Sequence, residues 1–190
     1  MQQYIQNLIV NIEPLIKPIT SYCSGATKQH IRIPLEDVNP MLLAFLNTHN
    51  VGIRLVELFY IPPKAQCGIH VDYVPDGQSG DYVKLNWQTG GKDSVMRWYE
   101  QKDKLITKEY SLSKIGSKYM EYAVDEVNCI YTAAVGYPSI VQVCVPHNIV
   151  NFDEPRYVLS IVPRHFTSDG ELGRAVSMVD AIEIFRNFTV

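Results

Sequence analysis

Two side chains with metal-binding groups, His70 and Asp72, stand two positions apart in the segment Gly68-Ile-His-Val-Asp. If this segment is a β-strand, alternate side chains point to the same face, so one imidazole and one carboxylate meet there. A second imidazole, His147, directly follows the apolar segment Ile140–Pro146. Two imidazoles and one carboxylate form the facial triad that holds non-haem Fe(II) and leaves coordination positions open. The sequence therefore predicts a metal site at His70, Asp72 and His147.

A guanidinium and a hydroxyl share one face of the predicted strand that begins at Arg156 and ends at Pro163. Because alternate residues of a strand lie on the same side, Arg156 and Ser160 are neighbours on that face. A guanidinium binds a carboxylate through two parallel hydrogen bonds. This face is therefore a predicted site for a ligand that carries a carboxylate.

The order of these residues resembles the Fe(II)- and 2-oxoglutarate-dependent dioxygenases over roughly residues 55–163. The resemblance rests on His70-Val-Asp72 and on the run Pro146-His147-Asn-Ile-Val-Asn-Phe-Asp-Glu-Pro-Arg156-Tyr-Val-Leu-Ser160. That run is most similar to aspartyl/asparaginyl hydroxylases and to prolyl hydroxylase-like members. Many aspartyl hydroxylases lack the carboxylate ligand, which is present here as Asp72. The resemblance implies Fe(II) at His70, Asp72 and His147, with 2-oxoglutarate as co-substrate and its far carboxylate on Arg156 and Ser160.

Two further side chains are predicted cofactor contacts within this resemblance. The segment Tyr82–Gln88 alternates polar and apolar residues, which places Lys84 and Asn86 together on its polar face. A half-exposed strand surface explains the same alternation equally well. Tyr60 ends an apolar segment just before Pro62, at the predicted mouth of the barrel. We therefore expect Asn86 and Tyr60 to contact the bound cofactor.

A different metal site is suggested by the pairs Cys67-x-x-His70 and Cys144-x-x-His147, which have the spacing of a tetrahedral zinc site. Residues three apart on a regular strand face opposite sides, so each cysteine needs a turn or bulge to join its histidine. Gly68 permits such a bulge at the first pair only. Zinc bound by Cys67, His70, Cys144 and His147 is therefore kept as the alternative.

The remaining histidines are not predicted ligands. His165 follows Arg164 beyond the last predicted strand and has no long apolar strand before it, so His147 is preferred as the second imidazole. His30 and His49 lie near predicted loops or a helix end, and we expect them to be ordinary surface residues.

Short segments rich in Val, Ile and Tyr alternate with turn residues, which is typical of an all-β fold. The predicted strands are Gly52–Ile61, Gln66–Tyr73, Asp81–Gln88, Ser94–Glu100, Cys129–Val135, Ile140–Pro146 and Arg156–Pro163. Helices are predicted after Asn39, where Pro40 takes the first helical position, and over Val176–Phe188. With the resemblance, the predicted fold is mainly β, a double-stranded β-helix (jelly-roll, cupin-like) core with flanking N- and C-terminal helices.

Length and composition favour one domain over residues 1–190, with the core at about 52–166 and helical support in 1–51 and 167–190. Seventeen Lys and Arg against twenty Asp and Glu give a net charge of -3, which argues against nucleic acid as a partner. Four cysteines do not make a disulfide scaffold. Neither a signal peptide nor a membrane span is recognisable, so we expect a cytoplasmic protein without a membrane partner.

The predicted function is an Fe(II)- and 2-oxoglutarate-dependent oxygenase that hydroxylates a protein side chain or a small molecule and releases succinate and CO2. The alternative is a non-catalytic jelly-roll that serves as a structural, assembly or binding module. No recognition motif indicates the substrate, and the oligomeric state is left open.

Overall fold

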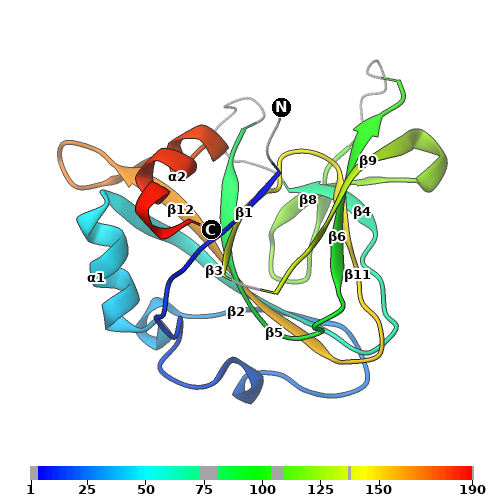
Figure 1. Ribbon diagram of the computed structural model, residues 1–190, viewed down its shortest axis with the longest axis horizontal. Coiled ribbons are helices and arrows are strands. Elements are labelled where there is room, and N and C mark those ends of the chain that lie inside the picture. The colour runs from blue at the N-terminus through cyan, green and yellow to red at the C-terminus, as the bar shows by residue number, and fades with distance from the viewer. Residues whose placement is uncertain (1–3, 73–80, 104–108, 137, 190) are drawn as a thin grey trace.

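The computed structural model describes residues 4–72, 81–103, 109–136 and 138–189, which form two antiparallel sheets that face each other (Figure 1). The large sheet runs from edge to edge through β1 (Ile5–Asn7), β10 (Ser139–Gln142), β5 (Val83–Gly90), β12 (Arg156–Phe166), β3 (Val51–Ile61) and β2 (Gln29–Arg32), and β13 (Leu172–Ala175) pairs with β12. The small sheet runs through β7 (Ser111–Leu112), β8 (Lys118–Tyr122), β4 (Ile69–Asp72), β11 (His147–Val150), β6 (Val95–Gln101) and β9 (Val127–Ala134).

The chain winds between these sheets in a regular way. Strands β3, β4, β5 and β6 alternate between the large and the small sheet, and β9, β10, β11 and β12 repeat the alternation. The four-stranded cores are ordered β10-β5-β12-β3 and β4-β11-β6-β9, with every pairing antiparallel. Eight strands connected in this manner are a jelly-roll. The predicted mainly-β jelly-roll fold is confirmed.

Both helices begin at a residue that caps them. The Asn39 side chain accepts the Met41 backbone N–H at the start of α1 (Pro40–Thr48), with Pro40 at the first position. Ser177 caps α2 (Met178–Ile184) in the same way, by accepting the Asp180 backbone N–H. Helix α2 is shorter than the predicted Val176–Phe188, because the chain turns at Phe185 into the 3-10 turn Arg186–Phe188. Neither described helix is long and apolar enough to cross a membrane.

The helices cover the outer face of the large sheet (Figure 1). Leu46 of α1 and Ala181 of α2 are fully buried in one apolar cluster with Leu58, Leu85 and Leu159 of the sheet. Strand side chains alternate, so the neighbouring residues of these strands point inward, toward the small sheet. The inner face carries polar residues, and these position the candidate site.

Several segments differ from the sequence predictions. The region 167–190, expected to give helical support, contains strand β13 as well as α2. The segment Ile140–Pro146 was expected to be one strand that ends at His147. Instead β10 ends at Gln142 in the large sheet, and β11 begins at His147 in the small sheet, because the chain crosses between sheets at this point. The first 51 residues contain β1 and β2 as well as α1, with 3-10 turns at Ile19–Ser21 and Leu35–Asp37. Strands β7 and β8 and the 3-10 turn Val124–Glu126 were not predicted, and Tyr73, the end of one predicted strand, lies outside the described residues.

Candidate metal centre

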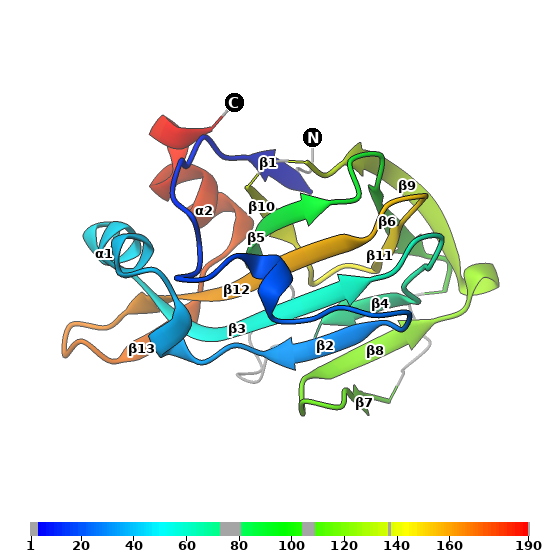
Figure 2. The same ribbon diagram turned by 90° about the horizontal axis from the view of Figure 1, so that it is seen from below.

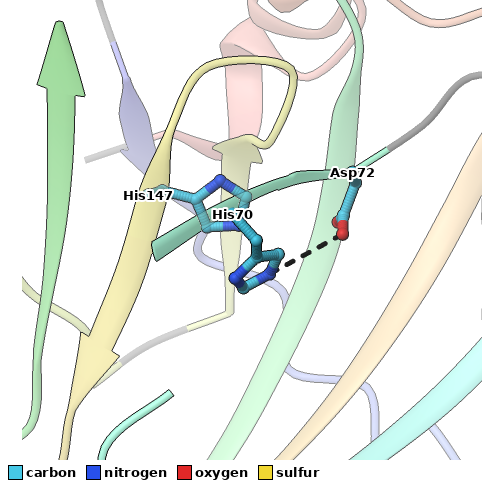
Figure 3. A group of neighbouring side chains, drawn as sticks. All are labelled: His70, Asp72 and His147. Atoms are coloured by element: carbon cyan, nitrogen blue, oxygen red, sulfur yellow. Dashed lines mark ion pairs between the residues drawn. The ribbon is translucent and has the colours of Figure 1, made fainter. Parts of the chain in front are cut away.

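The structure brings His70, Asp72 and His147 together from two neighbouring strands of the small sheet (Figure 3). His70 and Asp72 lie two residues apart on β4, and His147 opens β11 directly opposite His70. One ligand atom from each residue lies within 4.8 Å of the other two. Within the described part of the chain, no other group of three or more His, Cys, Asp or Glu side chains brings its ligand atoms this close together.

Backbone carbonyls orient both imidazoles. Nδ1 of His70 lies 2.9 Å from the Gly68 carbonyl oxygen, and Nδ1 of His147 lies 2.8 Å from that of Val145. A carbonyl oxygen only accepts, so each Nδ1 carries the proton and each Nε2 keeps its lone pair. His70 Nε2 points toward Asp72, 3.7 Å from its Oδ1 (Figure 3). Both rings are thus held in the tautomer that binds a metal through Nε2.

Burial and neighbouring charges give His147 and Asp72 the protonation states that metal binding requires. Burial, with a smaller effect of His70, lowers the pKa of His147 to about 3, so this imidazole is neutral at neutral pH. Burial opposes the charge on Asp72, but the Lys84 ammonium and the two imidazoles outweigh it and place the pKa of Asp72 below its ordinary value. The centre therefore offers a neutral imidazole and an ionised carboxylate, as metal coordination requires.

A buried lysine holds the other oxygen of the carboxylate ligand. Lys84 Nζ lies 2.8 Å from Asp72 Oδ2 and 2.8 Å from Oε2 of Glu57. Burial opposes the charge on Lys84, but the two carboxylates raise its pKa above the ordinary value. Since Lys84 occupies Oδ2, Oδ1 is the Asp72 oxygen that remains on the side of His70.

Glu57 is the residue of this network that sequence reasoning missed. Its side chain is 1% exposed, it accepts the Ser117 hydroxyl at 2.6 Å, and Oε1 lies 3.1 Å from His30 Nε2. His30, expected to be a surface residue, is half-buried and stacks on Phe59 with ring centroids 4.2 Å apart. A signal was present in the sequence, since Glu57 interrupts an apolar strand, and a charged residue there must be paired when buried.

The cysteines do not join the centre. Cys67 and Cys144 are absent from the group of ligand atoms that the described residues bring together. Cys144 Sγ instead accepts the Tyr82 backbone N–H at 3.4 Å, and burial raises the pKa of its thiol to about 11. Burial also raises the pKa of Cys67. Both thiols are therefore protonated in the metal-free protein at neutral pH, and the four residues of the zinc alternative are not brought together among the described residues, where the close group of ligand atoms is His70, Asp72 and His147.

The residues predicted to hold the co-substrate line up across β5 and β12. Ser160 lies opposite Asn86, and its hydroxyl donates to Asn86 Oδ1 at 2.7 Å. Arg156 Nε donates to Gln88 Oε1 at 2.7 Å. The polar face predicted for each strand is therefore present, and side chains of the two faces contact each other inside the jelly-roll.

Arg156 is a buried cation without a carboxylate partner. It is 3% exposed, and none of the acidic residues that the structure describes forms an ion pair with it. Burial lowers the pKa of Arg156 to about 10, so the guanidinium keeps its charge at neutral pH. Buried charges in folded proteins are normally paired. A ligand carboxylate would supply the missing partner.

Tyr60 and His165 are engaged elsewhere. The Tyr60 hydroxyl donates to the Gly25 carbonyl at 2.5 Å and its ring packs on Tyr157, although the residue borders the cavity described next. His165 Nε2 lies 3.3 Å from Asp180 at the start of α2, away from the triad. The preference for His147 over His165 as a member of the cluster agrees with the structure.

A cavity of about 920 Å³ opens beside the triad. His70 and Asp72 line it together with Glu57 and Lys84, and Cys67, the neighbour of Arg156, forms part of its wall. The volume lies near the upper end of the roughly 300–1,000 Å³ typical of ligand sites. Two of the three candidate metal ligands, His70 and Asp72, therefore face a space large enough for a small ligand.

Comparison with known proteins found structural likeness only. No protein-family model matches the sequence, and no curated protein sequence matches it. Oxalate oxidase in complex with the substrate analogue glycolate aligns with a TM-score of 0.37 and 10% identity over 91% of this chain and 85% of that chain. Peruvianin-I, a cysteine peptidase from Thevetia peruviana latex, aligns with a TM-score of 0.34 and 10% identity over 85% of this chain and 89% of that chain. Likeness at this level carries no argument about chemistry.

The donor set fits a divalent transition metal. Two imidazole nitrogens and one carboxylate suit Fe(II), and they leave the side toward the cavity open. The chain thus carries a candidate His-Asp-His metal site within a jelly-roll fold.

Proposed function

We propose that the protein is an Fe(II)- and 2-oxoglutarate-dependent oxygenase that hydroxylates its substrate. The observation that carries the proposal is that a candidate facial triad occurs together with Arg156, a buried guanidinium that pairs with no carboxylate of the described residues. A metal and a dicarboxylate together account for both features, whereas a purely structural jelly-roll accounts for neither.

Each residue has a defined task in this proposal. His70, Asp72 and His147 would hold Fe(II), with Lys84 orienting the carboxylate through Oδ2. Arg156 would bind the far carboxylate of 2-oxoglutarate, and Gln88 holds the guanidinium in place. When bound, iron and 2-oxoglutarate supply the oxidising chemistry: one oxygen atom of O2 enters a substrate C–H bond, and the other enters succinate as CO2 is lost.

The first test is succinate formation from 2-oxoglutarate by the full chain with Fe(II), in the absence of any other substrate. We expect His147→Ala and Asp72→Ala to abolish both succinate formation and iron binding, measured separately by metal analysis. His165→Ala is the matched control, because this histidine lies outside the triad. Undiminished iron binding in both triad variants would exclude these ligands.

The second test concerns Arg156. We expect Arg156→Met to raise the KM for 2-oxoglutarate by about 10- to 100-fold, since a charged hydrogen bond to a carboxylate contributes roughly 1.5–3 kcal/mol. An unchanged KM would show that Arg156 has another role. Absence of succinate under all conditions, with iron bound, would favour the non-catalytic binding module.

A further inference from the structure

The cavity collects positive charge in a chain that is acidic overall. Seven of the 15 Lys and Arg that the structure describes line it, compared with three of the 19 Asp and Glu that it describes. One of the seven, Lys84, is neutralised by Glu57 and Asp72. The other six cations are Lys28, Arg32, Arg54, Lys114, Lys118 and Arg164. Apart from Glu57 and Asp72, the acidic residue in the described lining of the cavity is Glu121.

Several of these cations have no local counter-charge. Arg32, Arg54 and Lys114 are exposed, and within the described part of the chain no carboxylate forms an ion pair with any of them. They come from three separate elements: β2, β3 and the turn between β7 and β8. Unpaired charges of one sign around a cavity produce a potential that attracts ligands of the opposite sign.

The proposed co-substrate does not account for this charge. One carboxylate of 2-oxoglutarate belongs at the metal and the other at Arg156, which is not among the residues that line the cavity. A five-carbon dicarboxylate also fills only part of about 920 Å³. The exposed cations are therefore available for a second, separate anionic molecule.

The strand edges beside the cavity favour an extended polypeptide as that molecule. Residues of β2, the edge strand of the large sheet, and of the β7–β8 hairpin, at the edge of the small sheet, line the cavity. These two edges lie next to each other in Figure 2. Edge strands present backbone N–H and C=O groups to which an extended peptide can hydrogen-bond. Most aromatic rings that line the cavity already contact another ring: His30 stacks on Phe59, Tyr60 packs on Tyr157, and Tyr119 makes an edge contact with His70. Fewer ring faces are therefore free for nucleic-acid bases to stack on.

We propose that the cavity binds an acidic polypeptide segment, and that this segment is the substrate. The second half of this statement rests on the proposed function; the first does not. Asp and Glu side chains of the segment would meet Arg32, Arg54 and Lys114, while the residue to be hydroxylated reaches the triad past Glu57 and Lys84.

Binding is tested first on the metal-free full chain without 2-oxoglutarate. The probe is a fluorescently labelled Glu/Gly peptide, compared with an equally long Lys/Gly peptide, an oligothymidylate and citrate. We expect the Glu/Gly peptide to bind most tightly, with an affinity that falls as salt rises. Tighter binding of the oligothymidylate or of citrate would overturn the proposal in favour of nucleic acid or a small anion.

Charge reversal tests the location. We expect Arg32→Glu with Arg54→Glu to weaken binding of the acidic peptide at least about tenfold, because like charges then face each other. The control pair, Lys17→Glu with Arg186→Glu, makes the same change in net charge outside the cavity lining and should alter affinity less than about twofold. Equal losses in both pairs, with unchanged thermal midpoints, would overturn the assignment to this cavity.

Oxygenation is tested last, by mass spectrometry of the acidic peptide after incubation with Fe(II), 2-oxoglutarate and the protein. Gain of one oxygen atom supports the substrate assignment, and succinate formation without peptide oxygenation overturns it. Peptide binding without any succinate would overturn the proposed function and leave the binding site standing, so the two failures are distinguishable.

Discussion

At the residue scale, Lys84 determines whether the carboxylate ligand of the metal centre is ionised. It lies between the buried carboxylate of Glu57 and the half-buried carboxylate of Asp72, at 2.8 Å from each. Each carboxylate is kept ionised by this ammonium, because burial alone would favour its protonated form. The lysine thus keeps Asp72 charged and leaves one of its oxygens for a metal.

Removal of this cation should destabilise the fold. We expect Lys84→Met to lower the free energy of unfolding of the metal-free protein by about 3–5 kcal/mol, since it leaves buried carboxylates unpaired. Chemical denaturation measures the change, with Lys114→Met as an exposed control expected to lie within about 0.5 kcal/mol of wild type. Adding Glu57→Leu to Lys84→Met should recover part of the loss. If Lys84→Met unfolds at the wild-type denaturant concentration, the network does not stabilise the fold.

At the element scale, the position of His147 depends on the crossing between sheets. Strand β10 leaves the large sheet after Gln142, and β11 enters the small sheet at His147, opposite His70. The first turn of α2 likewise depends on other elements, because ion pairs connect it to β12 and β13. Asp180 is paired there with Arg174 and His165 and accepts the Ser177 backbone N–H.

The ion pair and hydrogen bonds of Asp180 at the start of α2 predict that the stability of the fold depends on pH. Hydrogen bonds from Arg174 and Ser177 hold the pKa of Asp180 well below its ordinary value. Its contribution is therefore complete above the pKa of an unfolded Asp and is lost as the pH falls through the folded-state value. We expect the difference in free energy of unfolding between wild type and Asp180→Asn to be largest near neutrality and to shrink in acid. Asp153→Asn, at an exposed pair, should show a smaller and flatter difference. A pH-independent difference for Asp180→Asn would contradict this account.

At the scale of the whole molecule, a metal would link two strands that are distant in sequence, β4 and β11. A ligand that binds only the folded state stabilises it, by about 2.7 kcal/mol at a concentration 100 times its Kd. We expect Mn(II), which suits the same donors, to raise the thermal midpoint of the wild type and of His165→Ala, but not of His147→Ala. An equal shift in all three proteins would place the metal elsewhere.

Sequence patterns predicted the features of this molecule that depend on neighbouring residues along the chain. The cap at Asn39 and the shared face of Arg156 and Ser160 follow from local rules, the first from helix capping and the second from strand alternation. Glu57 was missed because its partners are distant in the sequence: Lys84 lies on β5, and Ser117 lies in the turn before β8. The strand expected to end at His147 was misplaced because hydropathy does not record which sheet a strand joins.

The sequence by itself determined the chemistry that is available: a His-x-Asp pair, a later histidine, an arginine at a strand start and a slightly acidic composition. Tertiary structure decided which of these groups meet. It brought His147 opposite His70 and left Cys67 and Cys144 out of the triad. It also buried Arg156 away from every described carboxylate and gathered Arg32, Arg54 and Lys114 around one cavity. The reason is physical: alternation along a strand fixes the face of each side chain, but only the pairing of distant strands fixes its neighbours.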